Sequence, residues 1–172
     1  RGLCVDDSIV TENSWDSIHE FKKSLRWKSP QDSEFFDRNG FGLLGYASTS
    51  DCVVVVQEIL TMISSFPDEK TRTSSLESRA PKGGIVGLGI PYGTTALIGA
   101  MIASRSEIVS LLLEHGADPV ATDVTGNDPL MFASMFGRTD NVRFWLKKFP
   151  DWDLERRNTV NGAVALGCAV YM

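Results

Sequence analysis

The sequence has few of the residues that most often build metal or redox sites. Its 172 residues include only three cysteines, Cys4, Cys52 and Cys168, and two histidines, His19 and His115. The cysteines are widely spaced and form no Cys-x-x-Cys pair, so we expect neither a disulfide framework nor a zinc site. Neither histidine has a ligand partner at helical spacing. The sequence therefore predicts no metal and no cofactor, and this cysteine usage fits an intracellular protein, in the cytoplasm or an organelle interior.

Long apolar runs and an excess of one charge are also missing. The longest continuous apolar stretches, such as Val53–Val56, are far shorter than the roughly 18 residues of a membrane-spanning helix. The net charge is −5, with acidic and basic residues interspersed along the chain. This pattern lacks the basic patch of a nucleic-acid-binding protein. We expect no transmembrane segment and no nucleic-acid partner.

Recognisable catalytic motifs are absent as well. No Gly-x-Ser-x-Gly elbow occurs for a nucleophilic serine. The glycine-rich stretch GGIVGLGIPYG resembles a phosphate-binding loop only superficially, because Gly87-x-Gly89 would need a third glycine where Tyr92 stands. We therefore predict that the chain is not an enzyme. A nucleotide bound at this stretch is the alternative that would reverse that prediction.

What the sequence does contain is a repeat with a fixed period. Several small or apolar residues return after 33 positions and fall at helical spacing within each unit. A period in this range is typical of stacked supersecondary units, in which each unit covers the apolar face of its neighbour. The recurring pairs are Gly93 and Gly126, Leu97 and Leu130, Ala100 and Ala133, Val109 and Val142, and Leu113 and Leu146.

These units resemble ankyrin repeats. The opening of the family's first helix is matched by Gly93-x-Thr95-x-Leu97-x-x-Ala100. The second helix is matched by Glu107-Ile108-Val109-x-Leu111-Leu112-Leu113, and the closing turn by Gly116-Ala117-Asp118. The resemblance implies an all-α fold, an ankyrin-type helix-turn-helix solenoid. It also implies a non-catalytic module that binds another protein.

The repeat register divides the chain into six segments. Residues 14–28 carry an amphipathic pattern that predicts an N-terminal capping helix. Val53–Val56 alone would indicate a strand, but the register places it in a helix. Because the sequence starts at Arg1 and stops at Met172, halfway through a unit, we expect a fragment of a longer chain. The segments are 1–36 with the capping helix, a degenerate repeat at 37–63, an inserted loop at 64–92 that is polar and exposed over residues 66–82, repeats at 93–123 and 124–158, and a truncated repeat at 159–172.

Two features depart from the family pattern. The third repeat ends in Phe149-Pro150-Asp151 instead of Gly-Ala-Asp, so the left-handed glycine cap is lost and the proline must end the helix. The family's histidine in the first helix is also missing, and we expect apolar packing to replace its hydrogen bonds. The residues at the histidine position are Gly45, Ile98, Met131 and Gly167.

The resemblance also predicts where a partner binds. Partners of the family usually bind the concave side, which the turn tips and the first helices form. Phe132, Met135 and Phe136 would make an apolar patch there if exposed, but the inserted loop could instead cover them. We predict a protein–protein interaction scaffold, such as a structural subunit held by a permanent neighbour in a multiprotein complex. The alternative is a regulatory or targeting domain of an enzyme or channel. The positions left free for a partner are Ile102, Ala103, Asp123, Thr125, Asn127, Phe132, Met135 and Phe136.

Overall fold

The computed structural model describes residues 42–49, 53–80, 82, 89–103 and 105–170. The predicted capping helix lies outside these residues, as do residues 83–88 of the glycine-rich stretch. The described part consists of helices joined by turns and contains no strand, which confirms the all-α prediction. Its helices are α2 (Gly42–Ser48), α3 (Val53–Ser64), α4 (Glu69–Leu76), α5 (Ala96–Ala103), α6 (Ser106–Glu114), α7 (Pro129–Met135), α8 (Thr139–Lys148) and α9 (Ala165–Val170).

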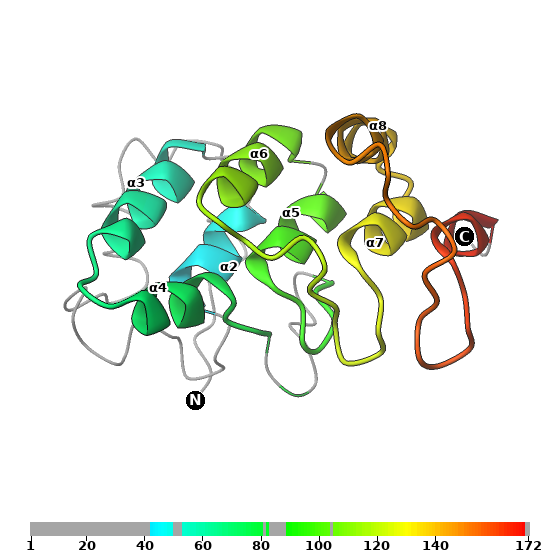
Figure 1. Ribbon diagram of the computed structural model, residues 1–172, viewed down its shortest axis with the longest axis horizontal. Coiled ribbons are helices and arrows are strands. Elements are labelled where there is room, and N and C mark those ends of the chain that lie inside the picture. The colour runs from blue at the N-terminus through cyan, green and yellow to red at the C-terminus, as the bar shows by residue number, and fades with distance from the viewer. Residues whose placement is uncertain (1–41, 50–52, 81, 83–88, 104, 171–172) are drawn as a thin grey trace.

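Most of these helices are stacked as antiparallel pairs. The pairs are α2 with α3, α5 with α6 and α7 with α8, and α9 begins a fourth unit. The first helices α2, α5, α7 and α9 pack in succession in one layer, and α3, α6 and α8 form the second layer (Figure 1). Turn loops extend from the first layer on the edge away from the second helices. The predicted helix-turn-helix solenoid is confirmed.

Equivalent residues in the first helices of the second and third units have equivalent surroundings. Leu97 and Leu130 are 1% and 2% exposed, and Ala100 and Ala133 are both fully buried. One continuous apolar core runs through the stack from Leu43 to Cys168. Full burial of a leucine side chain stabilises a fold by about 1.5–3 kcal/mol, so each unit depends on its neighbours for much of its stability.

The first unit follows the repeat register and not the local strand propensity. Val53–Val56 forms the first turn of α3. Val55 and Val56 are fully buried, together with Ile59 and Leu60 one turn later. This spacing puts all four side chains on the face that packs on α2, so tertiary packing decides the outcome.

The prediction of an exposed loop over residues 66–82 is wrong, because this stretch contains α4. Asp68 caps the helix, and its Oδ1 accepts a hydrogen bond from the Thr71 N–H at 2.7 Å. Arg72 donates to the Phe66 carbonyl at 2.6 Å and so fixes the entry to the helix. Ser75 and Leu76 are buried where α4 packs on α3 and α2. Capping and packing thus form a helix that the residues' own propensities do not favour.

The insertion is in fact divided between two places. The Ala80 N–H donates to the Thr94 carbonyl at 2.8 Å, so this bond closes a turn loop whose ends are 14 residues apart in the sequence. The corresponding bond of the next unit, from the Asp123 N–H to the Asn127 carbonyl at 3.0 Å, joins residues only four apart. The other extra residues lie between α3 and Ala80 and include α4. One part of the insertion therefore lengthens a turn loop, and the other adds a helix. We name the loops finger 1 (residues 80–94), finger 2 (123–127) and finger 3 (158–163).

The end of the third unit is closed by aromatic side chains. No left-handed residue follows α8, since Phe149 has a φ of −125°, whereas Gly116 after α6 has a φ of 90°. The expected loss of the glycine cap is therefore confirmed. Trp145, Phe149 and Trp152 form a triangle with ring centroids 4.8, 5.1 and 5.6 Å apart. Trp145 is fully buried, so this triangle anchors the chain where the usual turn is missing.

Candidate functional site

Neighbouring fingers lie in direct contact. A Cβ atom at Gly93 would be 2.7 Å from Cγ1 of Val124, and one at Gly126 would be 2.9 Å from the Thr159 backbone nitrogen. Both glycines also have a φ of 79°, which other residues rarely adopt. The Thr159 N–H donates to the Thr125 carbonyl at 2.9 Å and ties finger 3 to finger 2. The recurring glycine is therefore needed both for the turn and for the close approach of successive fingers.

Finger 2 is held rigid by its own polar groups. The Asp123 carboxylate accepts hydrogen bonds from the backbone N–H groups of Thr125 and Asn127, both at 2.9 Å, and from the Thr125 hydroxyl at 2.8 Å. The Asn127 Oδ1 accepts from Nδ2 of Asn158 at 3.0 Å. Asp123 and Asn127 are buried. These two predicted partner contacts therefore order the fingers, and Thr125 remains half-buried at the tip.

The first helices carry a second apolar cluster on the side away from the main core. It contains Ile98 and Ile102 from α5 and Phe132 from α7, with Phe136 packed against them. The Phe132 and Phe136 rings stack with centroids 6.4 Å apart. Ile98 occupies the position of the family's histidine and is fully buried, as expected if apolar packing replaces the hydrogen bonds of that histidine.

This cluster corrects the predicted apolar patch. Phe132 is 2% exposed and Ile102 is buried, so neither side chain is free on the surface. Met135, Phe136 and Ala103 are half-buried, at the edge of the same region. The alternative in which the glycine-rich part of the insertion covers the patch stays untested, because residues 83–88 are not described.

Exposed apolar side chains occur at several places in the described residues, among them the finger tips. Tyr92, Val124 and Val160 are 43%, 53% and 70% exposed, one on each finger. We name these three residues the fingertip row. The sequence prediction missed them, although the register contains a signal, since Val124 and Val160 both stand two positions before the finger glycine. Lone exposed apolar residues are common, but a row on adjoining loops is typical of a recognition surface.

Polar side chains at the start of α8 bond to the end of the first helix α5 and so support the position of the fingers. Asn141 of α8 is fully buried, and its Nδ2 donates to the carbonyls of Ala100 and Met101 at 3.2 and 3.0 Å. Arg138 donates through Nε to the Ile102 carbonyl at 2.6 Å. These bonds pair carbonyls at the end of α5, of which that of Ala100 also accepts the Arg105 N–H at 3.1 Å. They also fix α7 and α8 relative to α5, and so fix the spacing of the fingers.

Two carboxylates whose pKa is raised by burial, those of Asp128 and Glu77, make hydrogen bonds that stabilise the fold. Burial raises the pKa of Asp128 against the opposing effect of the Met131 N–H and Arg156. Burial also raises the pKa of Glu77, whose carboxylate accepts a hydrogen bond from the Asp118 N–H at 2.8 Å. Asp128 caps α7, and Glu77 ties the end of α4 to the second repeat.

The described residues also hold no group of three or more His, Cys, Asp or Glu that could bind a metal. Among them, no helix has the length and apolar character needed to cross a bilayer. A small pocket between α3, α4 and the end of α6 is lined by Arg72, Thr73 and His115, among others. Its polar lining groups make bonds within the fold: the Ser64 hydroxyl donates to the Leu60 carbonyl at 2.8 Å, Glu69 pairs with Arg72, and Nδ1 of His115 lies 2.9 Å from the Leu111 carbonyl.

Comparison with known proteins agrees with this architecture. A family model for ankyrin repeats in three copies matches residues 75–170, more than half of the chain. The chain therefore belongs to the ankyrin repeat family. Ankyrin repeats are protein–protein interaction modules, and the family is typically non-catalytic.

Two curated relatives carry the same repeats. Ankyrin repeat domain-containing protein 63 of Mus musculus is 31% identical over 90 residues, which cover 52% of this chain and 23% of the relative. Its Homo sapiens counterpart is 30% identical over 90 residues, which cover 52% of this chain and 24% of the relative. The match thus spans about a quarter of the length of these relatives.

Proposed function

We propose that this chain is a non-catalytic module that binds another protein across its fingers. The observation that carries the proposal is the fingertip row, in which three exposed apolar side chains stand on interlocked loops. The half-buried residues Ala103, Thr125, Met135 and Phe136 would extend the contact toward the first helices. Binding residues are often found on loops that a rigid scaffold positions, as these are.

The rigidity of the fingers supports this proposal energetically. A flexible loop loses conformational freedom on binding, and that loss reduces affinity. Fingers 2 and 3 are already fixed by the Asp123 carboxylate, by the Asn127–Asn158 bond and by the Thr125–Thr159 bond. Burial of an exposed valine or tyrosine at a partner surface would therefore contribute most of its transfer free energy to association.

We infer a scaffold role, in which the module is a structural subunit held by a permanent neighbour inside the cell. The second candidate is a regulatory or targeting domain of a larger enzyme or channel. This second candidate requires a module within a larger protein, and the segment that matches this chain covers about a quarter of each of the two relatives. Both candidates use the same binding surface.

The proposal is tested by affinity capture with surface variants of the full chain. Val124→Lys combined with Val160→Lys places two charges in the fingertip row, where both side chains are exposed and folding should be preserved. Glu107→Lys on the outer surface of α6 is the matched control. Quantitative mass spectrometry should show partners that are retained by wild type and control and lost by the double variant. Identical partner sets for all three folded proteins would refute the assignment.

A further inference from the structure

The first helices of the repeats contain no charged residue. This holds for all four, α2, α5, α7 and α9, whose sequences are GLLGYAS, ALIGAMIA, PLMFASM and ALGCAV. The second helices α6 and α8 differ sharply. Their charged residues are Glu107, Glu114, Asp140, Arg143, Lys147 and Lys148.

The two positions before each finger glycine are also uncharged. The positions directly before the finger glycine hold Tyr92, Thr125 and Asn161, and the positions before those hold Pro91, Val124 and Val160. All six are uncharged. Lys82 is exposed on finger 1, in the part of that loop that has no counterpart in the other two fingers.

Charged groups next to the fingers are already engaged. Asp123 uses its carboxylate within finger 2, as described above. Arg79 donates to the carbonyls of Gly93 and Thr122, at the base of fingers 1 and 2. Arg157 donates to the Gly162 carbonyl at 3.0 Å and lies 4.0 Å from the Glu155 carboxylate. These groups brace the loops and leave the fingertip row itself neutral.

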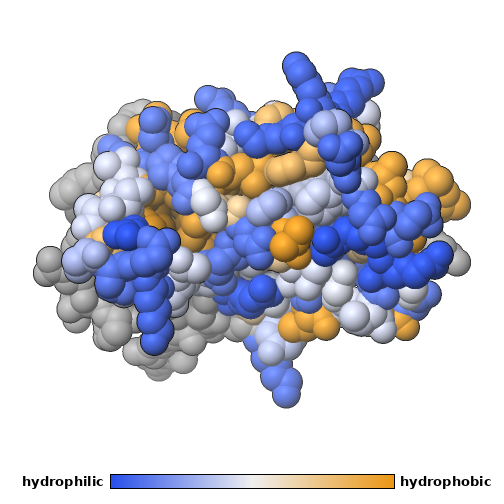
Figure 2. Space-filling model, viewed as in Figure 1, coloured by the Kyte–Doolittle hydropathy of each residue, from blue (hydrophilic) through white to orange (hydrophobic). Residues whose placement is uncertain are grey.

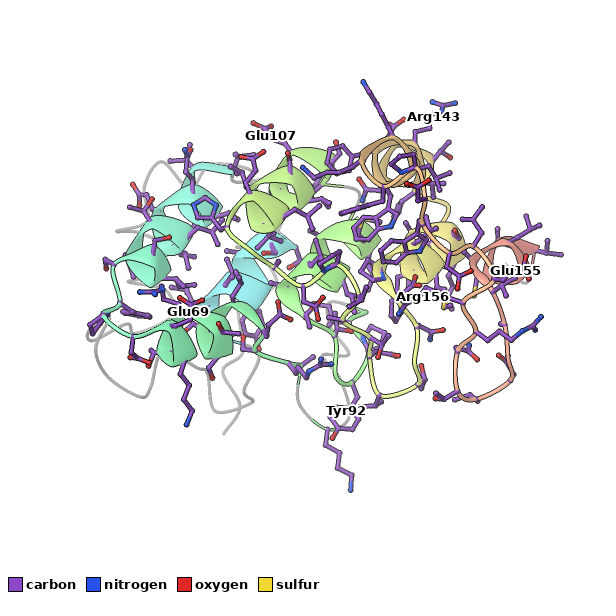
Figure 3. All side chains as sticks on the ribbon, in the orientation of Figure 1. Glu69, Tyr92, Glu107, Arg143, Glu155 and Arg156 are labelled. Atoms are coloured by element: carbon purple, nitrogen blue, oxygen red, sulfur yellow. The ribbon has the colours of Figure 1, made fainter. Side chains whose placement is uncertain are left out.

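Charged side chains occur on both edges of the molecule. Glu107 and Arg143 project from the second helices, whereas Tyr92 lies at the opposite edge (Figure 3). Figure 2 shows hydrophilic side chains projecting along the edge that α8 forms and also at the finger edge, where the apolar spots are separate. Lys82, Arg79 and Arg157 are exposed beside the fingers, whereas the fingertip row itself is uncharged. A partner segment that contacts this row alone would meet no charged group.

Resting on the proposed function, we infer that the partner offers an apolar, uncharged segment to the fingertip row. A carboxylate or ammonium group of the partner would lose its hydration against the fingertip row without gaining an ion pair there, which is unfavourable. Aliphatic or aromatic side chains have no such hydration to lose, and their burial is favourable. The absence of charge in the fingertip row thus selects against charged partner side chains at this row.

The probe for this inference is a displayed library of random peptides, selected on the full chain and counter-selected on an unrelated folded protein. Enriched peptides are expected to be rich in aliphatic and aromatic residues at their contact positions and poor in Asp, Glu, Lys and Arg. Their affinities, measured by fluorescence anisotropy, should change less than about twofold between roughly 50 and 500 mM sodium chloride, because no ion pair is formed. Val124→Lys should weaken binding at least about tenfold, and Glu107→Lys should leave it unchanged.

The possible results separate the two proposals. Enriched peptides that keep an acidic or basic residue, bind in a salt-dependent way and are sensitive to Val124→Lys would overturn the inferred partner chemistry and leave the binding function intact. Peptides whose binding ignores Val124→Lys would overturn the fingertip site itself. Failure to enrich any peptide above the unrelated protein would count against both proposals.

Discussion

Arg156 pairs with Asp128 at the start of α7, with Nε of the arginine 3.2 Å from Oδ2 of the carboxylate. The other oxygen of Asp128 accepts the Met131 N–H at 2.9 Å and caps the helix. The guanidinium group lies 5.2 Å from the ring centroid of Trp152. One buried carboxylate thus joins a first helix to the segment that leads into finger 3.

Asp128→Ala should destabilise the protein by about 1–3 kcal/mol. The alanine removes the helix cap, which is worth about 0.5–2 kcal/mol, and leaves the partly buried Arg156 without its partner. Asp128→Asn keeps an oxygen for the Met131 N–H and should lose clearly less. Urea unfolding of the three proteins measures the differences. An alanine variant within about 0.5 kcal/mol of wild type would show that this cap does not stabilise the repeat.

Glu77→Gln should change how stability depends on pH. Burial raises the pKa of Glu77 in the folded protein above its ordinary value of 4.5, against the opposing effect of the Asp118 N–H. A raised folded pKa means that the contribution to stability is complete below the ordinary pKa and is lost as pH rises through the folded pKa. Glutamine keeps the acceptor for the Asp118 N–H without the charge. Relative to wild type, the variant should therefore gain stability as the pH rises from the ordinary value of 4.5 through the raised folded pKa.

Urea titrations at several pH values measure this gain. Glu107→Gln, on the exposed surface of α6, is the matched control and should follow wild type. A Glu77→Gln variant whose stability difference from wild type stays constant with pH would contradict the proposed burial of the charge.

Gly126→Ala should cost more stability than Gly137→Ala. Both glycines have positive φ angles, 79° and 63°, so both alanines carry backbone strain of about 1–2 kcal/mol. Only at Gly126 would the new Cβ also meet finger 3, 2.9 Å from the Thr159 backbone nitrogen; at Gly137 nothing lies within 4 Å. Chemical unfolding should show an additional loss of about 1 kcal/mol or more for Gly126→Ala. Equal losses would mean that the fingers can separate without cost.

Much of the fold could be predicted because the repeat period identifies equivalent positions in successive units. The 33-residue spacing puts Leu97 and Leu130 in equivalent buried sites. The match of the first unit to the second, at an offset of 53 residues (Val55 to Ile108), places Val53–Val56 in a helix against its strand propensity. The inserted helix α4 could not be predicted in this way. It has no counterpart in the other units and little apolar periodicity, and it depends on the Asp68 cap and on burial of Leu76.

The site was harder to predict than the fold. The register says which positions packing within a repeat leaves free, but it does not say whether another group covers them. The repeat pattern leaves open whether Phe132 is exposed or covered, and it is buried with Ile98 and Ile102. Val124 and Val160 are not among the predicted contact positions, yet they are exposed apolar side chains. Exposure depends on contacts between units, which a repeat pattern does not specify.

Asn141 provides the last test, because it is polar where the second repeat has Ile108 at the same register position. Its Nδ2 donates to the carbonyls of Ala100 and Met101; the Ala100 carbonyl also accepts the Arg105 N–H, so the Met101 carbonyl depends more on Asn141. Asn141→Leu should therefore cost about 1–3 kcal/mol, the penalty for an unpaired buried carbonyl, despite the apolar gain.

Asn141→Asp should cost more than Asn141→Leu, because it would bury a carboxylate against two carbonyl oxygens. Arg143→Ala is the matched control on the same helix, since its side chain is largely exposed, and it should stay within about 0.5 kcal/mol of wild type. Urea unfolding measures all three. If Asn141→Leu proved as stable as wild type, apolar packing alone would hold α8 against α5. The fingers would then owe their spacing to the core and not to this hydrogen-bonded contact.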